Sequence, residues 1–266
     1  MSRLLRNIYM GVIALILVAP LVVIAGISLN ATKFLSFPPK GLSLRWYVEI
    51  FADSGWFSAL QNSLFVATTS AALAVSIALP IAYCLWRYKI LYARVLFSLG
   101  VTPFVLPPVI MALGFLLFFT TIEVHGLMIN VIIAHGIFLV ALPLITVSLG
   151  LESVQHEMIE AGQTLGADDI TVFRTVTFPI VRPYVISGFA FAFVLSLNEY
   201  IIAFMTVGFT VETLPIKIFN ALRYGYTPVM GSIAVVFLLV NVLVFGLIAR
   251  FGDLPKLLGA WSAQDE

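Results

Sequence analysis

The chain has 266 residues, of which 61% are hydrophobic and 10% are charged, and its formal net charge is +1. Soluble domains carry about 25% charged residues, so this composition excludes an ordinary soluble globular domain. The single cysteine excludes an internal disulfide and a cysteine-based metal cluster.

Long apolar intervals without charged residues mark the predicted membrane spans. A span needs roughly 20 apolar residues, and a charge near the bilayer centre is costly, so charges tend to lie at span ends. The intervals are continuously apolar and do not alternate, which favours helices over a closed barrel. We therefore predict an all-α, polytopic membrane protein with six transmembrane helices, near 8–29, 60–84, 95–120, 127–149, 183–207 and 230–250.

The first predicted span follows Arg3 and Arg6 and is too long for the apolar region of a signal peptide. We interpret it as a signal anchor. With the N-terminus inside, nine Lys and Arg residues fall on the cytoplasmic side and the other five of the 14 fall outside. The positive-inside rule then predicts that both termini are cytoplasmic.

The outside segment 30–59 is predicted to contain a short helix that Ser43 caps. Its aromatic and aliphatic residues suit a membrane interface: Trp46, Tyr47, Ile50 and Phe51. Two interpretations remain, a helix lying on the membrane and a contact surface for an external partner.

Three prolines predict a break in the third span, namely Pro103, Pro107 and Pro108. Such a break is tolerated where it lines a cavity, and a packing kink explains it equally well.

Residues 150–182 form a polar loop on the predicted cytoplasmic side. Glu152 or Ser153 is expected to start a helix with Val154, Met158, Ala161 and Leu165 on one face. Gly166 should end it. Asp168 should cap a second helix, and Pro179 should end that helix before the fifth span. The apolar faces either pack against the protein's own spans or dock on a partner.

The same loop resembles the EAA motif of bacterial ATP-binding-cassette (ABC) importer permeases. The motif's Glu-Ala-Ala, Gly and Ile-x-Leu-Pro correspond, with the spacing intact, to Glu160-Ala161-Gly162, Gly166 and Val176-Thr177-Phe178-Pro179. The departures at Gly162, Val176 and Phe178 keep small or apolar character. Three further segments resemble the spermidine/putrescine branch of these permeases: Gly41 to Tyr47, Asn62 to Leu64 and Leu214 to Ile216.

The resemblance implies one permease domain over 1–266 with the type I ABC importer fold, in the bacterial inner membrane. It implies that residues 150–182 are a coupling loop, which seats in a cleft of a separate ATPase through Glu160, Ala161, Gly162, Gly166 and Pro179. The implied partners are a second homologous permease, two ATPase subunits and a periplasmic solute-binding protein. The implied cargo is a small organic solute, either a polyamine such as putrescine or spermidine, or an opine or amino-acid derivative.

We expect no catalytic residues and no cofactor in this chain. None of its five lysines follows a glycine, so it has no Walker-type phosphate loop, and ATP and Mg would be bound by the partner ATPases. The stretch from His156 to Glu160 resembles the zinc-protease pattern HExxH, but Glu160 replaces the second histidine. We therefore expect no metal site there.

Glu199 is the one carboxylate at the depth of a predicted span. In one interpretation Ser196, Asn198, Glu199 and Tyr200 line the translocation pathway and favour a cationic solute. In the other, Glu199 is an interhelical tie or a gate. His135 is expected to be a hydrogen-bonded residue of the bundle. An alternative function is an ion-coupled carrier with Glu199 as its proton site; an intramembrane hydrolase lacks a visible nucleophile and base.

Overall fold

The computed structural model describes residues 3–225 and 227–251. Within these ranges the chain forms helices and loops, with one isolated bridge between Asn30 and Leu42. The prediction of an all-α protein is confirmed. The prediction of one permease domain over 1–266 stays a prediction, and its residues 252–266 lie outside the described part.

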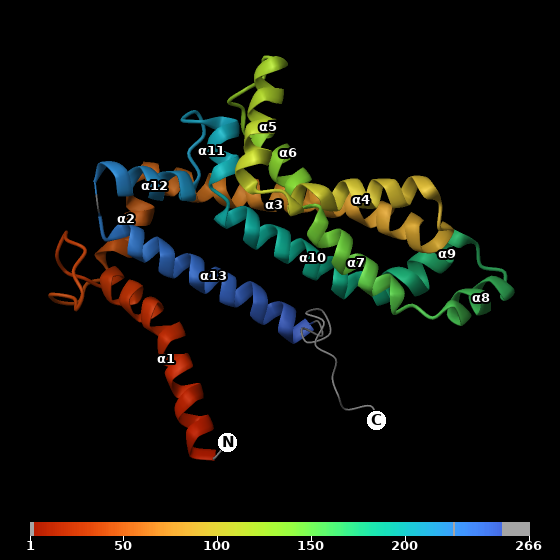
Figure 1. Cartoon of the computed structure of the whole chain (residues 1–266), viewed down its shortest axis with the longest axis horizontal. Coiled ribbons are helices and arrows are strands. Elements are labelled where there is room, and N and C mark those ends of the chain that lie inside the picture. Colours follow the sequence, from red (N-terminus) through yellow and green to blue (C-terminus); the bar gives the residue numbers. More distant parts are fainter. Residues whose placement is uncertain (1–2, 226, 252–266) are drawn as a thin grey trace. The chain divides into compact units, whose positions relative to one another are not determined.

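Figure 1 shows the helices, which divide between two compact units. The first unit comprises Met1–Leu60 and Lys217–Val242, and the second comprises Gln61–Ile216 and Leu243–Glu266. In chain order the helices are α1 (Arg3–Ser28), α2 (Arg45–Ala52), α3 (Ser54–Tyr88), α4 (Leu91–Val105), α5 (Pro108–Thr121), α6 (Met128–Leu139), α7 (Ala141–Glu152), α8 (His156–Thr164), α9 (Asp169–Val172), the π-helical turn η1 (Phe173–Thr177), α10 (Phe178–Asn198), α11 (Ile201–Val207), α12 (Leu214–Tyr224) and α13 (Val229–Phe251).

Four helical runs among the described residues are long and apolar enough to cross a membrane: Arg3–Ser28, Ser54–Tyr88, Asp169–Asn198 and Val229–Gly246. Two bent pairs also qualify if each pair counts as one crossing. The chain bends by 110° between α4 and α5, and by 43° between α6 and α7. The structure thus accommodates the six predicted spans.

The bend between α4 and α5 lies where the prolines predicted a break. Pro107 is the N-cap of α5 and Pro108 is its first residue. Proline is tolerated in the first helical turn, where its missing N–H would have no partner, and it pushes the residue before it out of the helical conformation. The preceding Leu106 is accordingly extended. Pro103, by contrast, lies inside α4 without ending it.

In the first unit, α2 is fixed to the C-terminal end of α1 and the residues that follow it. The Trp46 indole N–H donates to the Asn30 carbonyl (2.6 Å), and the hydroxyls of Ser28 and Tyr47 lie 2.8 Å apart. Trp46 and Ile50 are buried. The cap is Leu44, not the predicted Ser43, whose hydroxyl instead accepts the Arg45 N–H. One face of α2 therefore packs against the end of α1 and the loop that joins the two helices.

In the second unit, α7 and α10 lie side by side over a long stretch (Figure 1). Their close approach depends on glycine. A Cβ on Gly188 would lie 2.7 Å from the Pro143 Cα, and one on Gly150 would lie 2.7 Å from the Tyr184 ring. Small residues allow such backbone contact between membrane helices.

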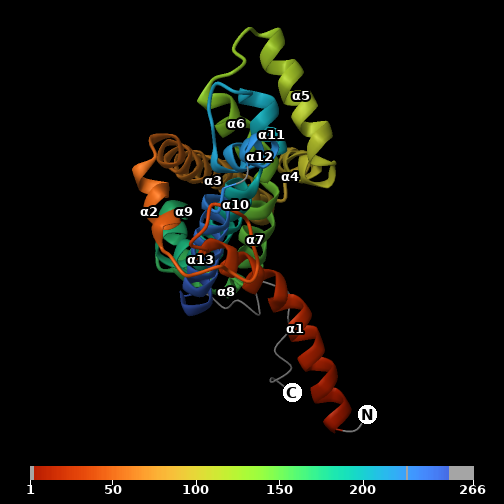
Figure 2. The ribbon, with the colours of Figure 1, turned by 90° about the vertical axis from the view of Figure 1, so that its left-hand side faces the viewer.

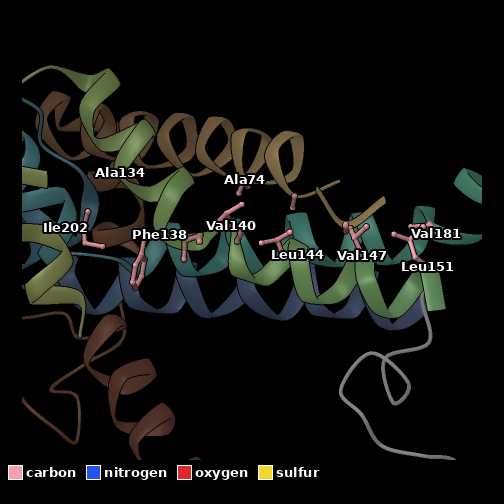
Figure 3. Close-up of a cluster of buried hydrophobic side chains, with 14 of the residues drawn as sticks. Ala74, Ala134, Phe138, Val140, Leu144, Val147, Leu151, Val181 and Ile202 are labelled. Atoms are coloured by element: carbon pink, nitrogen blue, oxygen red, sulfur yellow. The ribbon is translucent and has the colours of Figure 1, made fainter. Parts of the chain in front are cut away.

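Buried aliphatic side chains from α3, α6, α7 and α10 form the core of this unit (Figure 3). The short helix α11 packs against α5 and α6, and Figure 2 shows α5 alongside α11. The core thus holds both the coupling loop that follows α7 and the junction between α10 and α11.

Candidate functional site

The coupling loop contains the short helices α8 and α9. The predicted start of the first helix at Glu152 or Ser153 is wrong, because α7 runs through Glu152 and α8 begins at His156. The reason is local. The Ser153 backbone N–H and hydroxyl both donate to the Gly150 carbonyl, at 3.2 and 2.7 Å, so the chain turns at Ser153.

Gly166 directly follows the C-cap of α8, so this helix ends at Gly166 as predicted. Its φ of +88° is a conformation that residues with a side chain rarely adopt. The Gly166 N–H donates to the Gln163 carbonyl and the Ala167 N–H to the Gly162 carbonyl, at 2.9 and 3.1 Å. These bonds satisfy carbonyls at the end of α8, so a substitution at Gly166 would strain the turn.

Asp168 caps α9, which confirms the second sequence prediction for this loop. Its carboxylate accepts the Thr171 backbone N–H at 2.9 Å. Hydrogen bonding from the Thr171 side chain and backbone lowers the pKa of the Asp168 carboxyl below its usual value. The carboxylate is fully exposed, so this cap works in water.

The prediction that Pro179 ends the second helix is wrong. The run from Asp169 to Asn198 is continuous over 30 residues, and Pro179 is the second residue of α10. The π-helical turn explains the difference. The Phe178 N–H donates to the carbonyl of Phe173, five residues back, so the widened turn ends just before the proline that lacks an N–H. The predicted span 183–207 therefore begins in a longer helix and is broken at Glu199.

The apolar residues of the loop divide between two surfaces. Ile159 and Val172 are buried in the core of the second unit. Leu165, Ile170 and Met158 are 89%, 61% and 48% exposed.

Among the motif residues, Glu160, Ala161, Gly166 and Pro179 are exposed, and Gly162 is half-buried. Gly162 lies where α8 meets α9, since a Cβ there would lie 3.3 Å from a Val172 methyl. Val154, which we expected on the same face as Ala161, precedes α8 and is buried.

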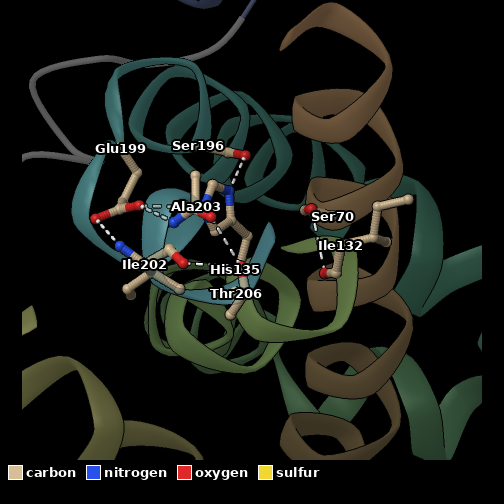
Figure 4. A network of polar contacts seen from close by, with 8 residues as sticks. All are labelled: Ser70, Ile132, His135, Ser196, Glu199, Ile202, Ala203 and Thr206. Atoms are coloured by element: carbon tan, nitrogen blue, oxygen red, sulfur yellow. Dashed lines mark hydrogen bonds and ion pairs between the residues drawn. The ribbon is translucent and has the colours of Figure 1, made fainter. Parts of the chain in front are cut away.

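The second polar feature is the junction between α10 and α11 (Figure 4). The Glu199 carboxylate accepts the backbone N–H groups of Ile202 and Ala203, at 2.9 and 3.0 Å, and so caps α11. The sequence interpretation missed this role, although an acidic residue just before a helix is a recognisable cap signal.

His135 of α6 lies between Glu199 and Ser196. Its Nε2 is 3.2 Å from a Glu199 oxygen, and its Nδ1 is 2.8 Å from the Ser196 hydroxyl. The side chains of His135 and Glu199 are 1% and 10% exposed. The network joins α6 to the end of α10 and the start of α11.

The other two predicted pathway residues lie outside this network. The Asn198 amide donates to the Val194 carbonyl one turn back, at 2.7 Å, and Asn198 is exposed. The Tyr200 ring is stacked on Phe204, with ring centroids 5.6 Å apart. The four residues therefore separate into two that contact His135, Ser196 and Glu199, and two that do not, of which Asn198 is exposed and Tyr200 is half-buried.

The family described as "Binding-protein-dependent transport system inner membrane component" matches residues 74–253. The chain belongs to this family. It is therefore a multi-pass inner-membrane transport permease that works with a solute-binding protein.

Named relatives support the assignment over most of the chain. The chain is 31% identical to "Putrescine transport system permease protein PotI" of Escherichia coli (strain K12), over 84% of this chain and 81% of the relative. It is 27% identical to "Spermidine/putrescine transport system permease protein PotC" of Haemophilus influenzae, over 91% of this chain and 94% of the relative.

Solved structures share the fold. A bacterial ABC transporter involved in the import of the acidic polysaccharide alginate superposes with a TM-score of 0.70 at 17% identity, over 94% of this chain and 98% of that chain. The MetNI methionine ABC transporter gives a TM-score of 0.62 at 15% identity, over 83% of this chain and 100% of that chain. The predicted fold, that of type I ABC importer permeases, is confirmed.

Proposed function

We propose that this permease moves a polyamine across the inner membrane by alternating access, driven by a separate ATPase that docks on the coupling loop. The observation that carries the proposal is the set of exposed apolar side chains at Met158, Leu165 and Ile170. An exposed apolar group on a polar loop is suited to bury itself against a partner.

The motif residues give this surface its shape. Ala161 and Gly162 keep α8 narrow, and Gly166 supplies the turn that carries the exposed Leu165. Glu160 is exposed and can accept charge-assisted hydrogen bonds at the rim of a cleft. Pro179 stands at the start of α10, where the loop passes into the span. ATP and Mg would be bound by the ATPase, and this chain would bind no cofactor itself.

The proposed assembly contains a second homologous permease, two ATPase subunits and a periplasmic solute-binding protein. Both termini of this chain would lie in the cytoplasm, as the distribution of Lys and Arg favours. The α1 helix is consistent with such an assembly, because Ser28 is its only buried residue. Its apolar surface needs lipid or another subunit as a partner.

The choice of a polyamine rests on the names of the relatives, which describe spermidine/putrescine and putrescine transport systems. Another relative, 26% identical, is named a putative 2-aminoethylphosphonate transport system permease protein. An opine or amino-acid derivative is therefore the alternative cargo for the same machinery.

We propose that the route for the solute passes along Asn198 and Tyr200, with Ser196 and Glu199 behind them. Both Glu199 oxygens already accept backbone hydrogen bonds, so this carboxylate would shape the route and favour cations through its charge.

The test is ATP-dependent uptake of radiolabelled putrescine by the assembled transporter in proteoliposomes. We expect Leu165→Asp to abolish uptake and co-purification of the ATPase, because a charge would replace the most exposed docking side chain. Leu42→Asp is the matched control, since Leu42 is 77% exposed in a different loop, and it should retain the ATPase. If Leu165→Asp retained the ATPase and full uptake, the docking assignment would be wrong. Uptake driven by a pH gradient without ATP would instead indicate an ion-coupled carrier.

A further inference from the structure

The last turns of α3 reach the coupling loop through three side chains. The Trp86 indole is stacked on the His156 imidazole, with ring centroids 5.5 Å apart and planes 9° apart. The Tyr83 and Phe173 rings meet edge to face at 4.9 Å. The Arg87 guanidinium pairs with the Asp169 carboxylate at 3.2 Å.

Each contact falls on a different element of the loop. His156 begins α8, Asp169 begins α9, and Phe173 begins the π-helical turn. Gln163, near the end of α8, also donates to the Asp169 carboxylate at 3.0 Å. One short stretch of α3, Tyr83 to Arg87, therefore contacts every helical element of the loop before α10.

The packing beneath the loop points the same way. Tyr83 and Trp86 are half-buried against the core that also contains Ile159 of α8 and Val172 of α9. Leu165 and Ile170 of the same loop are instead exposed. The loop thus has some side chains in contact with α3 and others exposed and available to a partner.

We propose that Tyr83, Trp86 and Arg87 are positioning residues, which we call the α3 clamp, and that α3 moves with the coupling loop as one body. The inference rests on the proposed docking of an ATPase on this loop. The helix α10 is covalently continuous with the loop, and the clamp makes α3 a second rigid path into the membrane. A movement of α8 is then transmitted to α3 and α10 at the same time.

The geometry indicates which contacts carry most of this attachment. The Arg87 and Asp169 side chains are 23% and 52% exposed, and a water-exposed ion pair holds its partners weakly. Trp86, Tyr83 and Phe173 are half-buried and His156 is exposed. The stacked and edge-to-face arrangements of the two ring pairs fix orientation as well as distance. We expect Trp86 to matter more than Arg87.

The first experiment breaks the clamp in the assembled transporter. We expect the double variant Trp86→Ala with Arg87→Ala to retain the ATPase and hydrolyse ATP, with uptake per ATP reduced about fivefold or more. The conservative variants Trp86→Phe and Arg87→Lys should restore most of that ratio. Tyr92→Ala and Arg94→Ala, at exposed positions of α4, are the matched controls. A purely structural role would lower the yield of assembled transporter and leave uptake per ATP unchanged.

The second experiment restores the attachment chemically. Trp86→Cys and His156→Cys are combined with Cys84→Ser, so that a bifunctional thiol reagent joins α3 to α8 alone. We expect this variant to be poorly coupled before crosslinking and to recover uptake per ATP afterwards. If crosslinking abolished uptake, α3 and α8 would have to move apart during transport, and the proposal would be overturned.

The two proposals fail in different ways. If Leu165→Asp retained the ATPase and full uptake, the docking site itself would be wrong. If that variant lost the ATPase while the clamp variants kept full uptake per ATP, the docking site would stand and the α3 clamp would be wrong.

Discussion

Two helices of this permease begin with the same chemical device in opposite surroundings. At the start of α9, the Asp168 carboxylate accepts a backbone N–H in full contact with water. At the start of α11, the Glu199 carboxylate accepts two backbone N–H groups while it is almost entirely buried. Water can readily replace the first carboxylate as a partner, whereas the second lies where little water reaches it.

This contrast indicates which positions of the chain tolerate substitution. A buried N–H that loses its partner carries the full penalty of its desolvation, whereas an exposed one recovers most of it from water. The buried cap also has His135 as a third partner, which the exposed cap lacks. We therefore expect substitutions in the buried network to destabilise the protein more than substitution of the exposed cap.

The largest effect is expected for Glu199→Ala. It leaves the N–H groups of Ile202 and Ala203 without acceptors, at a cost of about 3 kcal/mol. The thermal midpoint of the purified permease should fall by roughly 6 to 12 °C. Glu199→Gln keeps one acceptor oxygen, so its thermal midpoint should lie between those of the wild type and Glu199→Ala. An unchanged midpoint in Glu199→Ala would mean that the carboxylate does not support α11.

His135→Ala should have the next largest effect, about 2 kcal/mol, because it leaves a cavity and removes one partner from Glu199. The backbone bonds to Glu199 remain, so the loss is smaller. A double-mutant cycle with Glu199→Ala measures their interaction, and we expect clear non-additivity. Simple additivity would contradict the shared network.

Ser196→Ala should cost about 1 kcal/mol, because His135 loses only the hydrogen bond to Nδ1. Thermal unfolding of Ser196→Ala and His135→Ala under the same conditions checks that the serine variant is the less destabilised of the two. An effect larger than that of His135→Ala would contradict the geometry.

Asp168→Ala should have little effect on global unfolding and should instead loosen α9. The measurement is hydrogen exchange at the Thr171 amide, with Asp168→Asn as the control that keeps an acceptor. The lowered pKa fixes the sign of the pH dependence. The ionised cap is complete above the usual pKa of 3.8 and is lost as the pH falls through the lower folded-state value. The wild-type protection of Thr171 should therefore be constant from about pH 5 to 8 once intrinsic exchange rates are removed.

The parts of the structure that the sequence predicts correctly depend on local chemistry. Gly166 ends α8, Asp168 caps α9, and the Pro107-Pro108 pair breaks the third span. Each depends on the backbone preferences of one or two residues. The apolar intervals similarly indicate the spans, because a membrane imposes length and composition directly.

The errors arise where neighbouring elements compete for the same residues. Glu152 is a plausible helix start, but α7 extends over it. Pro179 usually indicates a helix end, but the π-helical turn at Phe173–Thr177 lets the helix continue past it. A single sequence gives no signal for that turn.

The Glu199 network was predictable only in part. The buried acid and the polar His135 are visible in the sequence as anomalies in apolar surroundings. Their pairing is not, because 64 residues separate them and only the packing of α6 against α10 and α11 brings them together. The same reason hides the α3 clamp, whose Arg87 and Asp169 are 82 residues apart.

The unbroken helix from Asp169 to Asn198 also sets a distance. Thirty residues at 1.5 Å per residue give about 45 Å, which exceeds the roughly 30 Å of bilayer hydrocarbon by about 15 Å. The 35-residue helix α3 is longer still. One of these helices begins in the coupling loop and the other contacts the loop at one end. Helices of this length would hold the loop beyond the lipid head groups. A soluble protein could then bind the coupling loop without contacting the bilayer.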